Sequence, residues 1–187
     1  MNSKEHITVC ICTFKRPAYL SKLLNELQIQ ETGGQFSYSI VVVDNDVAFS
    51  AQETVHSLIK SANVHMQYFN VPEQNISLAR NKALEVADGE YIAFIDDDEF
   101  PTAKWLFSLY RAVNEYKVDG VIGPVIPYFE KTPPSWIIQG RICERRTFPT
   151  GKHLHWTETR TGNVLFSTRI FQKKNLPVQK GVWPDRG

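Results

Sequence analysis

The chain has 187 residues, of which 42% are hydrophobic and 22% are charged, and its formal net charge is +1. This length and composition indicate a globular protein of one domain or slightly more. A net charge so close to zero provides no strong field for a polyanion, so we predict no nucleic-acid partner. The polar start of the chain and the lack of an apolar run of about eighteen residues predict neither a signal peptide nor a membrane span, so we expect a cytoplasmic protein.

Strand and helix patterns alternate along the first two thirds of the chain. Strands are expected at residues 7–12, 39–43, 65–69, 91–95 and 120–126, and helices at 18–30, 51–61, 77–87 and 103–116. The first helix carries leucines at three- and four-residue spacing, which indicates a core-facing stripe. Gly89 suits a left-handed cap after the third helix. This alternation predicts an α/β fold with a mostly parallel, Rossmann-like central sheet flanked by helices.

The three cysteines do not form a disulfide framework, because their number is odd. Cys10 and Cys12 lie two apart on the first strand and therefore face the same side of the sheet. A bond between them would be strained, so we predict small buried thiols in a reducing compartment.

Four consecutive acids, Asp96 to Glu99, follow the fourth strand without a basic residue beside them in the sequence. Carboxylates this close repel one another unless a cation or water offsets them. Ligands of open α/β sheets bind at the carboxyl ends of the strands, so we predict a divalent metal that grips a phosphorylated ligand. The alternative is an acidic turn that caps the helix after Pro101.

Polar residues also follow the first two strands, at 13–16 and 44–46, and the three groups are expected to converge on one crevice. The chain has neither the glycine-rich dinucleotide fingerprint nor a phosphate-binding loop. The start of the third helix offers backbone N–H groups to an anion, with Arg80 and Lys82 nearby. These two cations cannot share one helix face, so one of them is expected in solvent.

Five segments in register resemble the family 2 inverting glycosyltransferases of the GT-A fold, in particular bacterial exopolysaccharide and lipopolysaccharide members. The matching segments are V-C-I-C-T-F-K-R-P (9–17), V-V-V-D-N (41–45), A-R-N (79–81), G-E-Y-I-A-F-I-D-D-D (89–98) and T-G-N (161–163). The resemblance covers almost the whole chain. It implies transfer of a sugar from a nucleotide diphosphate donor with inversion.

The resemblance also implies a role for each matching residue. Thr13 and Asp44 would line the nucleobase pocket, where a uridine-type donor is usual. Asp98, the last acid of the D-x-D motif, would bind the Mg²⁺ or Mn²⁺ that bridges the diphosphate. Asp96 would bind that metal too, or would contact the ribose or a metal-bound water, and Arg80 would face the diphosphate. From the residues alone, Asp44 can equally end a strand and Arg80 can equally be a solvated helix charge.

The region 127–187 is expected to shape the acceptor side, beside a donor-binding region at 1–126. The resemblance assigns Asn163 to substrate binding, and Trp136 offers an aromatic face to a sugar. Arg141, Arg145 and Arg146 suit an anionic acceptor or lipid phosphates, or are surface charge. His153 and His155 alternate as on a solvated strand. The expected acceptor is a saccharide or a lipid-linked one, and the resemblance leaves open a homodimer and peripheral association with the inner face of the membrane.

The acidic general base that inverting members carry after the T-G-N segment is not found here. Glu158 precedes that segment and Asp185 lies in the terminal tail, so the base is expected beyond Gly187, in a longer protein. Two other classes remain: a non-catalytic nucleotide-sugar-binding module, and a nucleotidyltransferase. The second would need a glycine-rich loop after the first strand, and residues 13–17 contain no glycine.

Overall fold

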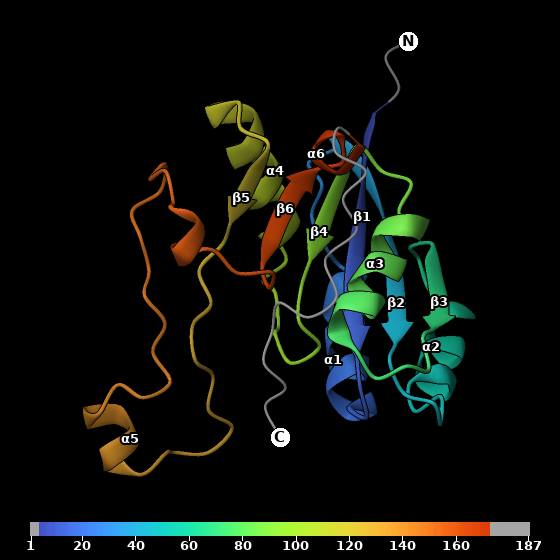
Figure 1. Cartoon of the computed structure of the whole chain (residues 1–187), viewed down its shortest axis with the longest axis horizontal. Helices are drawn as coiled ribbons and strands as arrows, with labels where there is room; N and C mark the ends of the chain where they lie inside the picture. The colour runs from blue at the N-terminus through green and yellow to red at the C-terminus, as the bar shows by residue number, and fades with distance from the viewer. Residues whose placement is uncertain (1–3, 173–187) are drawn as a thin grey trace.

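The computed structural model describes residues 4–172, which form a six-stranded sheet between layers of helices (Figure 1). The strands are β1 (Glu5–Thr13), β2 (Phe36–Asp44), β3 (Met66–Asn70), β4 (Tyr91–Phe94), β5 (Gly120–Ile122) and β6 (Val164–Ser167). The helices are α1 (Pro17–Leu27), α2 (Gln52–Ile59), α3 (Ile76–Val86), α4 (Trp105–Tyr116), α5 (Ser135–Gln139) and α6 (Arg169–Gln172), with a 3₁₀ turn η1 (Trp156–Glu158). Every strand and helix predicted between residues 7 and 126 is therefore present, with ends shifted by a few residues.

The strands lie in the order β3-β2-β1-β4-β6-β5. The first four are parallel, and β6 runs antiparallel to both β4 and β5. The predicted mostly parallel α/β sheet is thus confirmed. The sequence analysis missed β6, which comes from the expected acceptor region and pairs with strands of the expected donor region. The functional division at residue 126 stays a prediction, but the two regions share one sheet.

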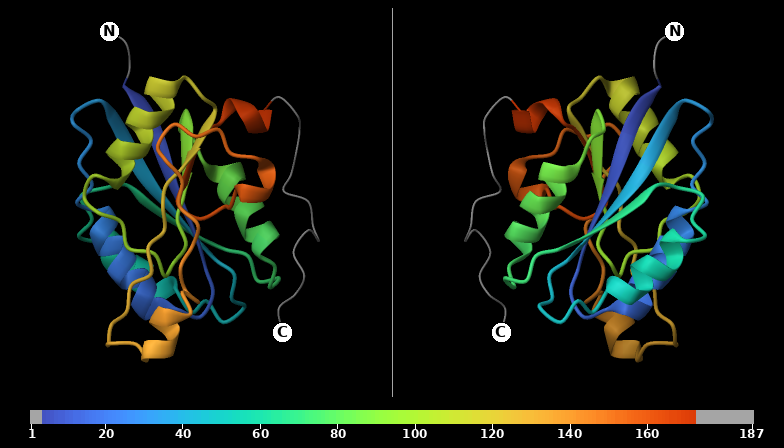
Figure 2. Two further views of the ribbon diagram at one scale, coloured as in Figure 1. Left: turned by 90° about the vertical axis from the view of Figure 1, so that its left-hand side faces the viewer. Right: turned by 90° about the vertical axis from the view of Figure 1, so that its right-hand side faces the viewer.

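Side chains of β1 alternate between two cores on opposite faces of the sheet. Ile7, Val9 and Ile11 pack under α1, α2 and α4. Cys10 belongs to the second core, with α3 and the strand residues beneath it. Figure 2 shows α1 and α4 on one side of the sheet and α3 on the other. This alternation confirms that Cys10 and Cys12 lie on the same face of the sheet. Burial raises the pKa of both thiols, that of Cys12 to about 12, as expected of unreactive cysteines.

Two local predictions are wrong. The strand expected at 120–126 ends at Ile122: Gly123 still donates to the carbonyl of Asn163 opposite it, but Pro124 follows and has no N–H to continue the pairing. Gly89 is not a left-handed cap, since Ala87 ends α3 in extended conformation. Gly89 instead permits close packing, because a Cβ there would lie 2.6 Å from the carbonyl oxygen of His6.

No helix within residues 4–172 is both long and apolar enough to cross a membrane.

Candidate active site

The carboxyl ends of β1, β2 and β4 meet at one edge of the sheet, as their parallel pairing requires. The amide of Asn45, just after β2, donates to the carbonyl of Thr13 at 2.9 Å. The hydroxyl of Thr13 donates to Asp97 Oδ2 at 2.7 Å. The predicted convergence of the three polar segments is therefore confirmed, and Thr13 lies beside the acids that follow β4.

Arg16 provides a cation for these acids. Its Nη1 lies 3.1 Å from Asp97 Oδ1 and 2.8 Å from Asp98 Oδ2. The charge of Asp97 is the main cause that raises the pKa of Arg16. Burial raises the pKa of Asp97, while the Thr13 hydroxyl and Arg16 oppose that rise. The sequence analysis assigned no role to Asp97 or Arg16; the position of Arg16 just after the first strand was the available signal.

Arg80 of α3 also faces the acids. Its side chain is only 14% exposed, and its Nη2 lies 4.0 Å from Asp96 Oδ1. Burial raises the pKa of Asp96, and Arg80 is the largest influence that lowers it. Lys82 instead pairs with Glu85 at 3.0 Å. Of the two readings of Arg80, the solvated helix charge is therefore wrong.

A second group of charges adjoins Asp96. Burial, followed by the charge of Asp96, raises the pKa of Glu99 to about 7. Arg160 donates to the carbonyl oxygen of Gly123 at 2.7 Å, and its charge and that of Arg145 favour ionised Glu99. Within residues 4–172, the buried Oε2 of Glu99 and Nε of Arg160 are left without a hydrogen-bond partner. The sequence analysis did not find this group.

The T-G-N segment packs directly on the acids. A Cβ on Gly162 would lie 2.6 Å from Asp96 Oδ2, so any other residue here would require the Asp96 side chain to shift. Asn163 is buried, and both polar atoms of its side-chain amide are hydrogen-bonded within the protein. Its Oδ1 accepts from the Trp105 indole N–H and its Nδ2 donates to the Pro124 carbonyl, each at 2.7 Å. Asn163 therefore holds the segment in place, and its expected contact with substrate stays a prediction.

Asp44 has no exposed surface. Its Oδ2 accepts from the amide of Ala51 at 2.8 Å and from the Tyr68 hydroxyl at 2.9 Å, and its Oδ1 accepts from the amide of Asp46 at 3.1 Å. The structure thus gives Asp44 the strand-ending role that the residues alone left open. Contact with a nucleobase stays a prediction, and it requires surface that Asp44 does not expose here.

The two expected metal ligands are half exposed, at 47% for the Asp96 side chain and 50% for that of Asp98. No three histidine, cysteine, aspartate or glutamate side chains gather as a metal cluster in the described part of the chain. Two accessible carboxylates nevertheless fit a Mg²⁺-type ion, because such ions commonly take one or two carboxylates and complete their shell with phosphate oxygens and water.

Other predicted residues lie away from the acids or outside the described range. Trp136 is 61% exposed on α5, at the tip of a loop that extends from the sheet (Figure 1). The expected strand at His153 and His155 is wrong, since His155 caps η1. The hydrogen bond from Lys152 lowers the pKa of Glu158, which makes it a poor proton acceptor. Asp185 falls outside the described residues.

The mostly parallel sheet, which carries acids, a threonine and arginines at its carboxyl edge, has the GT-A type of fold, and comparison with solved structures agrees. The Staphylococcus aureus TarS 1–349 structure in complex with UDP-GlcNAc superposes with a TM-score of 0.68 at 19% identity, over 92% of this chain and 48% of that one. The Pyrobaculum calidifontis mannosyltransferase PcManGT, solved with GDP-Man and Mn²⁺, gives 0.57 over 66% of this chain and 36% of that one.

Residues 8–176 match the family described as Glycosyl transferase family 2, and the chain belongs to that family. The succinoglycan biosynthesis protein ExoM of Rhizobium meliloti is 32% identical over 139 residues, which are 74% of this chain and 45% of ExoM. The chain thus spans less than half the length of this relative.

Proposed function

We propose that the chain forms the donor-binding part of an inverting glycosyltransferase that takes a uridine-type nucleotide sugar and passes the sugar to a saccharide or lipid-linked acceptor. The observation that carries this proposal is the meeting of Thr13, Arg16 and Arg80 with Asp96 to Asp98 at one sheet edge. The uridine preference is supported by TarS, whose solved complexes contain UDP and UDP-GlcNAc.

In this proposal Asp96 and Asp98 are the residues that would hold Mg²⁺ or Mn²⁺. When bound, such an ion acts as a Lewis acid that offsets negative charge on the departing nucleoside diphosphate. Arg80 and Arg16 add fixed positive charge at the same edge, and Thr13 holds Asp97 in place through its hydroxyl. Gly162 leaves room for the T-G-N segment to close over Asp96.

A thermal-shift experiment with UDP tests the donor site. Binding to the native state stabilises a protein by about 2.7 kcal/mol at a ligand concentration 100-fold above Kd. We expect a clear rise in Tm with UDP and Mn²⁺ together, and little with UDP and a chelator. Asp98→Asn should remove the Mn²⁺-dependent part. A wild-type shift that is equal with Mn²⁺ and with chelator would refute the metal assignment, and equal shifts for UDP, ADP and GDP would refute the uridine preference.

Asp119→Asn is the matched control for this experiment. Asp119 is also half exposed and also pairs with an arginine, Arg169, but it precedes β5 at the opposite edge of the sheet. Its substitution should leave the UDP response intact. If both variants lost the response equally, a general loss of surface charge would explain the result better than a metal ligand.

The general base stays a prediction. Within residues 4–172, Glu158 is ion-paired with Lys152 and Arg146, which leaves it unsuited to take the proton of an acceptor hydroxyl. Positioned bases contribute roughly 10²–10⁴-fold to such reactions. We therefore expect residues 1–187 to bind the donor and to transfer sugar slowly. Efficient transfer by this chain alone would contradict that expectation.

A further inference from the structure

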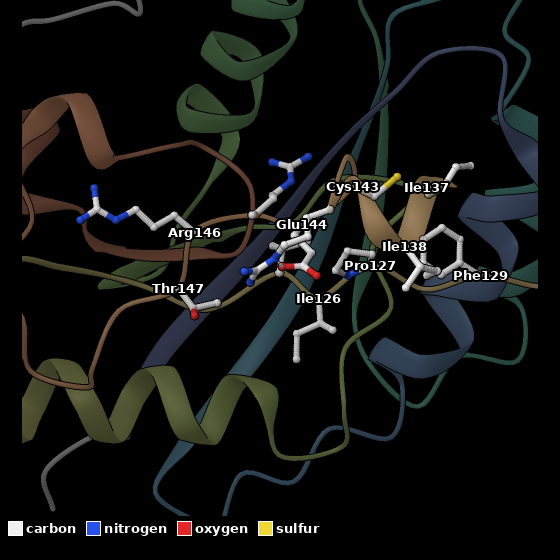
Figure 3. Close-up of a pocket in the computed structure, with 12 residues that line it drawn as sticks. Ile126, Pro127, Phe129, Ile137, Ile138, Cys143, Glu144, Arg146 and Thr147 are labelled. Atoms are coloured by element: carbon white, nitrogen blue, oxygen red, sulfur yellow. Dashed lines mark hydrogen bonds and ion pairs between the residues drawn. The ribbon is translucent and has the colours of Figure 1, made fainter. Parts of the chain in front are cut away.

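A cavity of about 700 Å³ lies between the segment after β5 and the segment that includes α5 (Figure 3). Its volume falls within the roughly 300–1,000 Å³ of typical ligand pockets. The side chains that matter for its chemistry are Ile126, Phe129, Ile138, Arg141, Arg145 and Arg146. None of these six residues belongs to the two cores that pack on the sheet.

One part of the lining is aliphatic and open to water. Ile126 is 77% exposed and Ile138 is 54% exposed. Exposed isoleucines that line one pocket gain free energy when a ligand removes them from water. A sugar or a free phosphate would cover them poorly, whereas a hydrocarbon chain would cover them well. The lining therefore favours a ligand with an apolar portion.

The other part of the lining is cationic. Three arginines share it with one acid, Glu144, which pairs with Arg141 at 2.6 Å. The Arg146 guanidinium is 3.6 Å from Glu158, outside the lining, and its side chain is 76% exposed. Arginines bind phosphate oxygens through paired N–H donors. The net positive charge thus favours an anionic head group next to the apolar portion.

Arg145 connects this cavity to the candidate active site. It lines the cavity, and its charge also acts on Asp96 and Glu99, lowering the pKa of each. Among the ion pairs within residues 4–172, none involves Arg145. The contacts of the T-G-N segment place the two sites next to each other: Asn163 donates to the Pro124 carbonyl at 2.7 Å, and Val125, the next residue, lines the cavity. One end of the cavity therefore adjoins the segment that packs on the acids.

We propose that this cavity binds the lipid-phosphate part of the acceptor, with the phosphate on the arginines and the hydrocarbon chain on Ile126 and Ile138. This inference rests on the proposed function, because it names the class of acceptor. A second copy of the chain fits less well, since a symmetric contact would oppose arginines to arginines. A nucleic acid would supply phosphates but no hydrocarbon for the isoleucines.

Calorimetry with geranyl phosphate, below its aggregation concentration and with a chelator present, tests the proposal. We expect geranyl phosphate to bind the wild type at least about tenfold more tightly than inorganic phosphate or geraniol does. Ile126→Ser combined with Ile138→Ser should weaken binding about tenfold or more, as should Arg141→Gln. Two control variants match these substitutions. Ile29→Ser changes an isoleucine that is 62% exposed, and Arg111→Gln changes an arginine that is 72% exposed and paired with a glutamate. Both controls should bind geranyl phosphate as tightly as the wild type does.

The same variants are measured for binding of UDP with Mn²⁺, which the isoleucine substitutions should leave unchanged. Normal UDP binding with no preference for geranyl phosphate would overturn the cavity assignment alone. Binding of geranyl phosphate without any binding of UDP would support the assignment of the cavity to a lipid phosphate and would refute the proposed binding of a uridine-type donor. Binding only to vesicles of anionic lipid, or self-association that the isoleucine variants abolish, would also overturn the proposal.

Discussion

Replacement of Thr13 by valine should destabilise the protein without changing its shape. Thr13 is 2% exposed and Asp97 is 6% exposed, and the Thr13 hydroxyl donates to Asp97 Oδ2 at 2.7 Å. Valine keeps the volume but leaves a buried carboxylate oxygen without that donor. Hydrogen bonds to charged groups contribute about 1.5–3 kcal/mol. For a chain of this size, each kcal/mol lowers Tm by roughly 2–4 °C, so we expect a decrease of about 3–12 °C.

Urea denaturation at neutral pH measures this free energy directly. Thr13→Ser is the matched control, because serine keeps the hydroxyl and loses only a methyl group, which costs about 1 kcal/mol. The valine variant should be the less stable of the two. If Thr13→Val unfolded within about 0.5 kcal/mol of the wild type, the argument that this hydroxyl holds Asp97 would be refuted.

Three further substitutions test other contacts. Gly162→Ala places a Cβ 2.6 Å from Asp96 Oδ2 and should weaken binding of UDP with Mn²⁺ in calorimetry, whereas Thr161→Ala should not. Gly89→Ala meets the His6 carbonyl oxygen at 2.6 Å, a backbone atom that yields little, so urea denaturation should show a loss of about 1–3 kcal/mol. Tyr68→Phe removes the hydroxyl that donates to Asp44 at 2.9 Å and should cost about 1.5–3 kcal/mol by the same measurement; no loss would mean that Asp44 is satisfied without it.

Most of the sheet could be predicted because its elements carry strong local patterns. The α1 leucines, all fully buried, repeat with the period of a helix, and β1 and β2 are long apolar runs. The strand β6 could not be found in this way, because four residues with no alternation depend on pairing with β4 and β5 for their structure. Periodicity reports local structure, whereas such pairing is a tertiary effect.

The candidate site was predicted in part for a similar reason. Residues just after strands, such as Thr13 and Asp98, could be placed at the sheet edge from topology alone. The arginines that act on these acids could not be placed in this way. Arg145 and Arg160 come from irregular segments that follow β5, far along the chain from the acids, and no sequence pattern indicates where such segments pass. The burial of Asp44 could not be predicted either, because the sequence around an aspartate at a strand end does not indicate whether its side chain contacts a ligand or other protein groups.

The position of β6 between β4 and β5 has a consequence for how the chain is made. During synthesis β4 is complete by Phe94, but its neighbour on one side begins only at Val164. Until then that edge of β4 is unpaired, and β5 has no strand to join within the described sheet. Unpaired strand edges invite association with other chains, and contacts between distant segments form slowly. A nascent chain that stalls before Val164 is therefore expected to be prone to aggregation, and the same pairing that closes the sheet also carries the T-G-N segment to the acids.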